Sequence, residues 1–296
     1  MSDLVAVTGA TGLVGRRVAE LLSERGRSVR LVARDVSRAP GFPGAEVVAA
    51  DFAQPETMRS AFAGASSAVV LAVGGSDGAR ARMHADAFEA AEAAGVDHIV
   101  YLSFQGAAAP GDGALARAHL ESEAALAATH VRATVLRANL FLDDLPQRFE
   151  PALERDGVAR GPAGRGAAAF VARDDVAAAI VGALEAEPGG ARPWHLTGPE
   201  ALTYVQVAQR LSALTGIDLT FEDEPVDVTR VRLERSGIPA WRVEDEICRD
   251  LTMAAGALEE VGDAVERFVG RPPIDLETHV RSDPQALAHL RPESAG

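Results

Sequence analysis

Three glycines near the start of the chain have the spacing of a phosphate-binding loop. Gly9, Gly12 and Gly15 stand in the segment TGATGLVG, between the apolar run LVAV and a helical pattern. In this context the first glycine allows a tight turn, the second lets the backbone approach a pyrophosphate, and the third lets the helix pack closely on the strand. Free N–H groups at the helix N-terminus would bind the anion. We therefore predict that a dinucleotide contacts Gly9, Ala10, Thr11, Gly12, Leu13, Val14 and Gly15.

The end of the second predicted strand indicates which dinucleotide fits. An NAD site places an acidic residue at this tip, where its carboxylate binds the ribose 2′-OH. Here the tip carries Arg34, and Arg38 follows four residues later in the segment LVARDVSRA. Two guanidinium groups suit a 2′-phosphate, because they donate forked, charge-assisted hydrogen bonds. We therefore predict NADPH, with NADH as the alternative if Asp35 occupies the tip instead.

Further cofactor contacts are expected where the other predicted strands end, because such sheets bind ligands at their carboxyl edge. Residues 51–52 would lie beside the adenine, and residues 72–74 would line the other side of the cofactor. The end of the sixth strand would pass beneath the nicotinamide. The predicted contacts are Asp51, Phe52, Ala72, Val73, Gly74, Ser103, Asn139 and Leu140.

A histidine and a glutamate four residues apart form the candidate catalytic pair. His119 and Glu123 share one face of a predicted helix, in the segment HLESE. In this interpretation Glu123 orients the imidazole, and His119 donates a hydrogen bond to the substrate oxygen. The alternative is a surface pair without a catalytic role. His84 and Tyr101 are expected to be structural.

Four residues are candidates for contacting the substrate. Phe104 and Gln105 follow the fifth predicted strand, and Phe141 ends the sixth. Trp241, in the segment IPAW, is a candidate to cap the cleft. Ordinary core packing is the alternative for Leu140, Phe141 and Trp241. The scattered histidines and single cysteine lack metal-ligand spacing, so we expect no metal site.

The absence of lysine excludes several reaction types. All 29 basic residues are arginine, so Schiff-base chemistry, a phosphate-loop lysine and a Tyr-x-x-x-Lys dehydrogenase pair are ruled out. A carbonyl reductase needs an acid to protonate the developing alkoxide. A quinone instead gives a phenolate stabilised by aromaticity, which a weak acid can protonate. The composition therefore favours an activated acceptor such as a quinone, or no catalysis at all.

The elements that position these residues alternate between strand and helix. Short apolar runs are predicted as strands at residues 4–9, 28–34, 45–51, 67–74, 97–103 and 132–141. Helical patterns separate them at residues 13–26, 55–64, 79–95 and 115–129. This alternation is typical of a parallel sheet in an α/β, Rossmann-type doubly wound fold.

The alternation of predicted strands and helices ends near residue 145, which predicts a second part of the chain. We expect a dinucleotide-binding domain over residues 1–145 and a smaller C-terminal α+β cap domain over residues 146–296, with the substrate cleft between them. Residues 170–187 should pack back onto the first domain, through a helix capped by Asp174 or Asp175. A later helix should be capped by Thr203.

Composition limits the partners and the location. The 296-residue chain carries a net charge of −14, which disfavours nucleic acid because an acidic surface repels phosphate backbones. Cys248 is the only cysteine, which excludes an intrachain disulfide framework. No segment has the pattern of a signal peptide or a membrane helix. We expect a cytoplasmic protein that binds a small aromatic molecule. A homodimer is the assembly that we consider.

Together the motifs resemble the atypical short-chain dehydrogenase/reductase superfamily, in particular its NmrA-like branch. The matching segments are VTGATGLVG, LVARD, AAEAAGVDHIVYLS, HLESEAAL, TVLRANLFLDDL, FVARDDVAAAIVGAL, HLTGPEALTYVQVAQRLSALTG, GIPAW and FVGRPPIDLETHV. The segment HLESE is similar to the His-x-x-Ser/Thr-Glu of NADPH:quinone oxidoreductase-type members. Related isoflavone reductases keep a lysine on this helix, which is absent here.

The resemblance and the missing lysine together imply an NADPH-dependent oxidoreductase that reduces a quinone or related conjugated aromatic carbonyl. A non-catalytic redox sensor that binds NADP(H) is one alternative. A tailoring ketoreductase or isomerase that acts on a polycyclic natural product is another.

Overall fold

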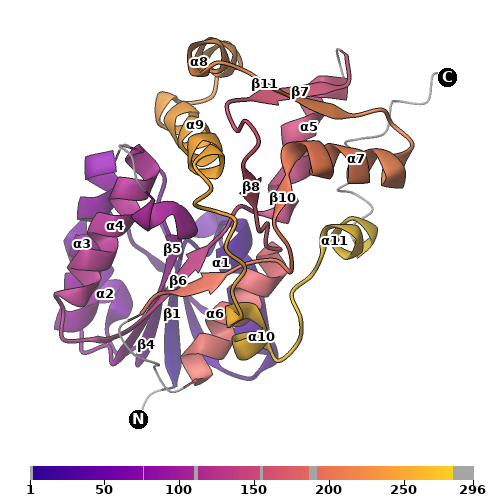
Figure 1. The fold of residues 1–296 in the computed structure, drawn as a ribbon. Coiled ribbons are helices and arrows are strands. Elements are labelled where there is room, and N and C mark those ends of the chain that lie inside the picture. Colours follow the sequence, from indigo (N-terminus) through magenta and orange to yellow (C-terminus); the bar gives the residue numbers. More distant parts are fainter. Residues whose placement is uncertain (1–2, 76, 110–112, 154–155, 187–191, 283–296) are drawn as a thin grey trace.

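A computed structural model describes residues 3–75, 77–109, 113–153, 156–186 and 192–282 (Figure 1). A seven-stranded parallel sheet forms its base, in the order β3-β2-β1-β4-β5-β6-β9. The order reverses between β1 and β4, which creates the crevice where doubly wound sheets bind ligands. The strands are β1 Leu4–Thr8, β2 Ser28–Ala33, β3 Glu46–Ala49, β4 Ser67–Val70, β5 His98–Phe104, β6 Arg132–Ala138 and β9 Trp194–Leu196. The predicted fold class is confirmed.

Helices cover both faces of the sheet because its strands are apolar on both sides. In β1, Val5 and Val7 pack toward one face, and Ala6 packs toward the other. The first face is covered by α1 Leu13–Glu24, α6 Arg173–Glu185 and α10 Ala264–Val269. The second is covered by α2 Pro55–Phe62, α3 Asp77–Ala93 and α4 Ala114–Ala127.

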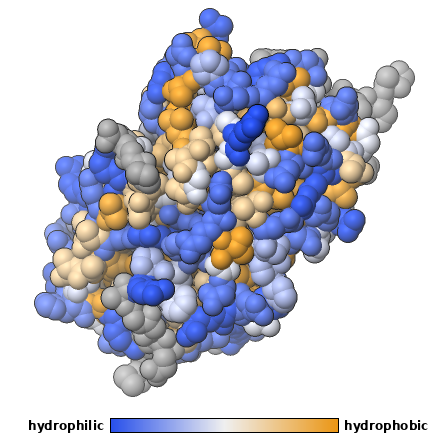
Figure 2. All heavy atoms as spheres, viewed as in Figure 1, coloured by the Kyte–Doolittle hydropathy of each residue, from blue (hydrophilic) through white to orange (hydrophobic). Residues whose placement is uncertain are grey.

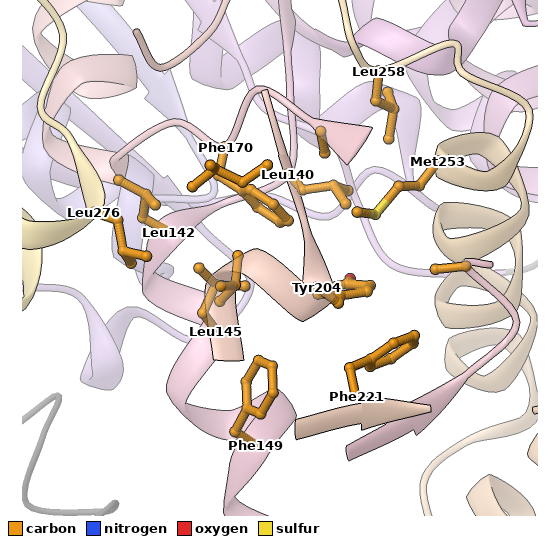
Figure 3. Packing of buried hydrophobic residues seen from close by; sticks show 14 of the residues in the cluster. Leu140, Leu142, Leu145, Phe149, Phe170, Tyr204, Phe221, Met253, Leu258 and Leu276 are labelled. Atoms are coloured by element: carbon orange, nitrogen blue, oxygen red, sulfur yellow. The ribbon is translucent and has the colours of Figure 1, made fainter. Parts of the chain in front are cut away.

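The second part sits above the carboxyl edge of the sheet. Its helices are α5 Leu145–Leu153, α7 Tyr204–Thr215, α8 Val226–Arg235, α9 Ala240–Ala254 and α11 Leu276–Ser282. Its strands form two small sheets, β8 Ala167–Ala168 with β10 Leu202–Thr203 and β7 Val158–Gly161 with β11 Thr220–Asp223. The core of this part packs around Phe149, Phe170, Tyr204 and Phe221, and it continues into Leu140 at the end of β6 (Figure 3). Short 3₁₀ turns occur at η1 Val36–Arg38, η2 Gln105–Ala108 and η3 Leu142–Asp144.

Two segments that follow residue 146 return to the sheet. Strand β9 extends it beside β6, and α10 packs on α6. Helix α6 itself packs on α1, as expected for residues 170–187. The boundary at residue 145 stays a prediction, and the chain passes between the two parts more often than that single boundary suggests.

The cap of α6 differs from the prediction. The helix begins at Arg173, and its N-cap residue Ala172 offers no side chain, so the expected cap by Asp174 or Asp175 is wrong. Asp175 instead accepts a hydrogen bond from the backbone N–H of Ile274 at 2.6 Å and pairs with Arg271 at 2.7 Å. Its carboxylate therefore connects α6 to the C-terminal segment and does not cap the N-terminus of α6.

The predicted cap at Thr203 is confirmed. Its hydroxyl accepts from the N–H of Gln206, whose side chain accepts from the N–H of Thr203. This capping box starts α7 at the point where β10 ends.

Hydrophilic side chains cover most of the face seen in Figure 2, and hydrophobic ones gather in smaller groups, one of them along α8 and α9. In the described part of the chain, no helix has the length and apolar character needed to cross a bilayer.

Candidate active site

The glycine loop has the geometry that its spacing predicts. Gly9 has a φ of +63°, a conformation that other residues rarely adopt. A Cβ at Gly15 would overlap the carbonyl oxygen of Gly9, so only glycine lets α1 lie this close to the end of β1. Gly12 is the N-cap of α1 and offers no side-chain acceptor. The first N–H groups of α1 are therefore available to an anion, and the cradle fits a dinucleotide pyrophosphate.

A cavity of about 680 Å³ lies between the carboxyl edge of the sheet and the second part. Its lining includes ten of the predicted site residues: Ala72, Val73, Gly74, Ser103, Phe104, His119, Asn139, Leu140, Phe141 and Trp241. The glycine loop, Arg34, Arg38, Asp51 and Phe52 lie outside this lining, as do Gln105 and Glu123. The cavity thus joins the ends of β4, β5 and β6 to helix α4.

His119 is held by a buried chain of hydrogen bonds. The N–H of Val73 donates to His84 Nε2 at 3.2 Å, so His84 carries its proton on Nδ1 and donates to Ser122 Oγ at 2.9 Å. Tyr101 is left to donate its hydroxyl proton to His119 Nδ1, 2.9 Å away. Because Nδ1 accepts, His119 must carry its proton on Nε2. The chain fixes one tautomer and leaves Nε2–H for the cavity.

Burial keeps this chain neutral. His119 is 5% exposed, and desolvation holds its pKa well below 6.5, helped by the positive charges of Arg80, Arg137 and Arg249. Desolvation likewise lowers the pKa of His84 to about 3. It raises the pKa of the Tyr101 hydroxyl. His119 is therefore a neutral hydrogen-bond donor at physiological pH.

The expected contact between Glu123 and His119 is wrong. Glu123 accepts from Ser103 Oγ at 2.5 Å and forms a forked pair with Arg137 at 2.6 and 2.9 Å. These bonds tie α4 to β5 and β6. The alternative of a surface pair is also wrong, because both side chains are largely buried.

Gln105 does not line the cavity, contrary to the prediction. Its side chain instead bonds to residues next to the cavity. Its Oε1 accepts from Asn139 Nδ2 at 2.9 Å, and its Nε2 donates to the carbonyl of Glu260 at 3.1 Å. Asn139 also donates to the carbonyl of Leu258 and accepts from the N–H of Leu140. These bonds fix the backbone at the end of β6.

Trp241 reaches from α9 across to the loop after β4. A Cβ at Gly74 would lie 2.8 Å from Cη2 of this indole, so the ring rests on the glycine. Beside it, Arg80 donates to the carbonyls of Val73 and Gly75 and forms a buried pair with Asp245 at 2.8 Å. The loop that was predicted to contact the cofactor is thus fastened to α9.

Several residues of the cavity were not predicted from the sequence, namely Arg80, Tyr204, Asp245 and Arg249. They stand on helices with ordinary charge patterns, and only the tertiary fold brings them to the sheet edge. The absence of lysine was the one available signal, since it makes arginine the only permanent cation for any site in this chain.

At the tip of β2, one carboxylate oxygen of Asp35 is bonded within the chain. Its carboxylate accepts from the N–H and hydroxyl of Ser37 at 3.0 and 2.6 Å, which lowers its pKa and caps η1. Arg34 and Arg38 are exposed on either side of it.

Comparison with known proteins agrees with this geometry. A family model described as NAD(P)H-binding matches residues 9–187. Quinone oxidoreductase 2 of Escherichia coli is 29% identical over 282 residues, covering 94% of this chain and 97% of that protein. A reductase of Streptomyces griseus, named (4-alkanoyl-5-oxo-2,5-dihydrofuran-3-yl)methyl phosphate reductase, is 31% identical over 271 residues, covering 91% of this chain and 94% of that protein.

Solved structures extend the agreement. The crystal structure of the Escherichia coli NADPH-dependent quinone oxidoreductase with NADPH has a TM-score of 0.85 at 28% identity, covering 94% of this chain and 99% of that chain. Triphenylmethane reductase of Citrobacter sp. with NADP(H) has a TM-score of 0.84 at 26% identity, covering 94% and 99%. The family model spans more than half of the chain, and its start coincides with the glycine loop. This chain belongs to the NAD(P)H-binding family, in the short-chain dehydrogenase/reductase group that its motifs resemble.

Proposed function

We propose that this protein is an NADPH-dependent oxidoreductase that reduces a quinone or a related conjugated aromatic carbonyl. The observation that carries the proposal is the neutral Nε2–H donor of His119 in a cavity that the predicted cofactor contacts Ala72, Val73 and Gly74 also line. The names of the relatives, a quinone oxidoreductase and a triphenylmethane reductase, support an aromatic acceptor.

The choice of NADPH rests on the tip of β2. Arg34 and Arg38 are exposed and offer forked donors for a 2′-phosphate. Ser37 engages one oxygen of the Asp35 carboxylate, so this group competes less for a ribose hydroxyl than a free carboxylate would. This favours NADPH over the NADH alternative.

Bound NADPH would supply the hydride, and the residues of the chain would hold the acceptor. His119 donates from Nε2 to the acceptor oxygen and stabilises the negative charge that develops there. Because the imidazole is neutral, it acts as a hydrogen-bond donor, and the product oxygen takes its proton from water. An aromatic phenolate tolerates this arrangement, whereas an aliphatic alkoxide needs a stronger acid.

Stopped-flow or steady-state absorbance of NADPH with 1,4-naphthoquinone tests the proposal. We expect steady NADPH oxidation by the wild type and a roughly 100-fold lower kcat in His119→Ala, since loss of one oxyanion donor has that size of effect. His119→Gln, which keeps an N–H donor, should recover part of the loss. Tight NADPH binding without turnover of any quinone would refute the proposal and support the sensor. The cytoplasmic location and the homodimer stay predictions of the sequence.

A further inference from the structure

We propose that the natural acceptor carries an anionic group, a carboxylate or a phosphate, and that the guanidinium of Arg249 binds it. The inference rests on the proposed function, because it assigns the substrate class of the same cavity. It is carried by the free donors of Arg249, its place in the cavity wall and the aromatic side chains around it.

Arginine dominates the charged groups of the cavity wall. Seven arginines line it against three carboxylates, in a chain whose net charge is −14. Each of the three carboxylates already has an arginine partner. Asp245 is paired with Arg80, Asp144 with Arg173, and Glu246 with Arg249. The wall therefore offers no unpaired carboxylate to a cationic substrate.

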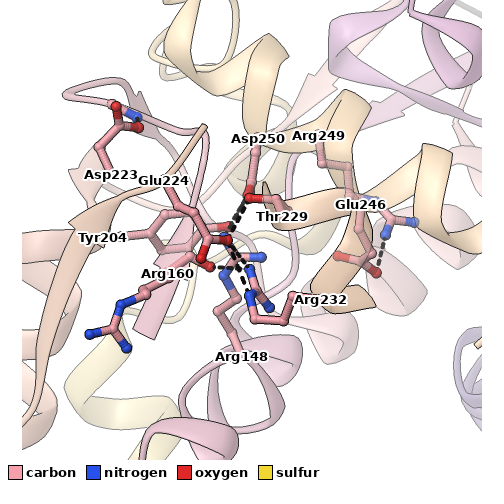
Figure 4. A network of polar contacts seen from close by, with 11 residues as sticks. Arg148, Arg160, Tyr204, Asp223, Glu224, Thr229, Arg232, Glu246, Arg249 and Asp250 are labelled. Atoms are coloured by element: carbon pink, nitrogen blue, oxygen red, sulfur yellow. Dashed lines mark hydrogen bonds and ion pairs between the residues drawn. The ribbon is translucent and has the colours of Figure 1, made fainter. Parts of the chain in front are cut away.

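Two of these arginines, Arg80 and Arg232, direct most of their donors to groups of the protein. Arg80 donates hydrogen bonds to Asp245 and to two backbone carbonyls. Arg232 donates through Nε and Nη2 to Glu224, and Nη2 also reaches the carbonyl of Arg160. Arg148 is 14% exposed and is held by Asp250 at 2.5 Å, over the ring of Tyr204 (Figure 4). Arg80 and Arg232 therefore have few donors left for a ligand, and the Nε of Arg148, which has no partner among the described residues, is buried.

Arg249 combines free donors with partial burial, whereas Arg242, which also lines the cavity, is exposed. Its Nη1 donates to Glu246 at 2.8 Å, while Nε and Nη2 have no hydrogen-bond partner within the described residues. The side chain is 33% exposed and lines the cavity. The Nε and Nη2 hydrogens form the planar fork that binds a carboxylate or phosphate through two oxygens. Figure 4 shows Arg249 and Glu246 beside the other charged groups of the network.

The surroundings of this fork fit an aromatic anion. Helix α9, which carries Arg249, packs against α4, which carries His119. The positive charge of Arg249 contributes to lowering the pKa of the imidazole. Phe104, Phe170 and Tyr204 line the same cavity and provide apolar surface for a planar ring. One molecule can therefore place a carbonyl at His119 and an acidic group at Arg249.

Matched acceptors test the inference. The probes are 3-(1,4-naphthoquinon-2-yl)propanoate, its methyl ester and the corresponding propyl phosphate, in which two or three methylenes separate the charge from the reacting ring. We expect the wild-type kcat/KM to be at least about 10-fold higher for an anionic probe than for the ester, as one forked ion pair provides. The carboxylate and phosphate arms distinguish the two sources of charge.

Two variants locate the effect. Arg249→Gln should lower kcat/KM for the preferred anion roughly 10- to 100-fold and reduce its advantage over the ester. Arg210→Gln removes an arginine that pairs with Glu200 away from the cavity, and should leave the preference unchanged. The comparison of probes in the wild type needs no variant, so it stands even if Arg249→Gln fails to fold.

Two outcomes would overturn the inference, and a third would count against the proposed function. Equal kcat/KM for the anions and the ester would refute it and leave the proposed function intact. A KM for NADPH that rises tenfold in Arg249→Gln, with the anion preference kept, would assign Arg249 to the cofactor phosphates instead. Reduction of none of the three probes, nor of 1,4-naphthoquinone, would instead count against the proposed function itself.

Discussion

At the scale of single residues, the protonation of His119 is decided by a neighbour on another element. The histidine was identifiable from the segment HLESE, but its partner was not. The i,i+4 spacing pointed to Glu123 because contacts within one helix can be read from the sequence. The actual partner, Tyr101, lies on β5 and reaches His119 only through the packing of α4 on the sheet.

This arrangement predicts that Tyr101→Phe lowers kcat with the naphthoquinone roughly tenfold, because His119 can then adopt the tautomer that lacks the Nε2 proton. The KM for NADPH should change little. In the His119→Ala background the same substitution should have almost no further effect on kcat, since a positioning residue acts only through the group it positions.

Thr134→Val is the control for Tyr101→Phe. It also removes a buried hydrogen bond, between β6 and β5. Thr134 bonds His98, away from the cavity lining, so its replacement should leave kcat near the wild-type value. Additive losses for Tyr101→Phe and His119→Ala would mean that Tyr101 has only a structural role.

At the scale of elements, the strands were predictable and the contacts between helices were not. Continuous apolar runs marked each buried strand, and the period of the pattern does not depend on distant partners. Asp174 and Asp175 looked like helix caps, yet α6 begins before them, because the chain enters it directly from the bridge at Val171. The contact between α6 and α10 gave no local signal at all.

Gly182, within α6, makes that contact possible. A Cβ there would overlap the carbonyl oxygen of Phe268 at the end of α10. Although alanine is favoured over glycine in a helix, we expect Gly182→Ala to lower the free energy of unfolding by roughly 1–3 kcal/mol, as overpacking does. Urea unfolding followed by circular dichroism measures the change.

Gly78, in the first turn of α3, provides the matched control. No atom lies within 4 Å of a Cβ built there, so Gly78→Ala should be neutral or stabilising by up to about 1 kcal/mol. Equal effects of the two substitutions would show that the α6–α10 approach is not tight in solution.

At the scale of the whole molecule, buried neutral histidines make stability depend on pH. Burial lowers the pKa of His98 to about 4, against 6.5 for the free side chain, with a smaller contribution from Arg132. The unfolded chain therefore takes up a proton as the pH falls below 6.5, while the folded protein does so only near pH 4. The stabilisation is complete above pH 6.5 and is lost between these two values.

Removing the histidine should flatten this dependence. From pH 6.5 to 4.5 we expect the free energy of unfolding of His98→Gln to fall by about 2 kcal/mol less than that of the wild type. Urea titrations at both pH values measure the difference. Parallel losses in the two proteins would show that His98 does not contribute.

The path of the chain between its two parts constrains how new enzymes can be made from this one. Strand β9 belongs to the central sheet and helix α10 covers one of its faces. The chain forms β7 and β8 of the second part before β9, and it forms α7 to α9 before α10. A single crossover near residue 145 would thus exchange the edge strand and two covering helices together with the cavity walls. Recombination that grafts another acceptor specificity onto this nucleotide-binding base therefore requires several junctions, placed on both sides of α6, β9 and α10.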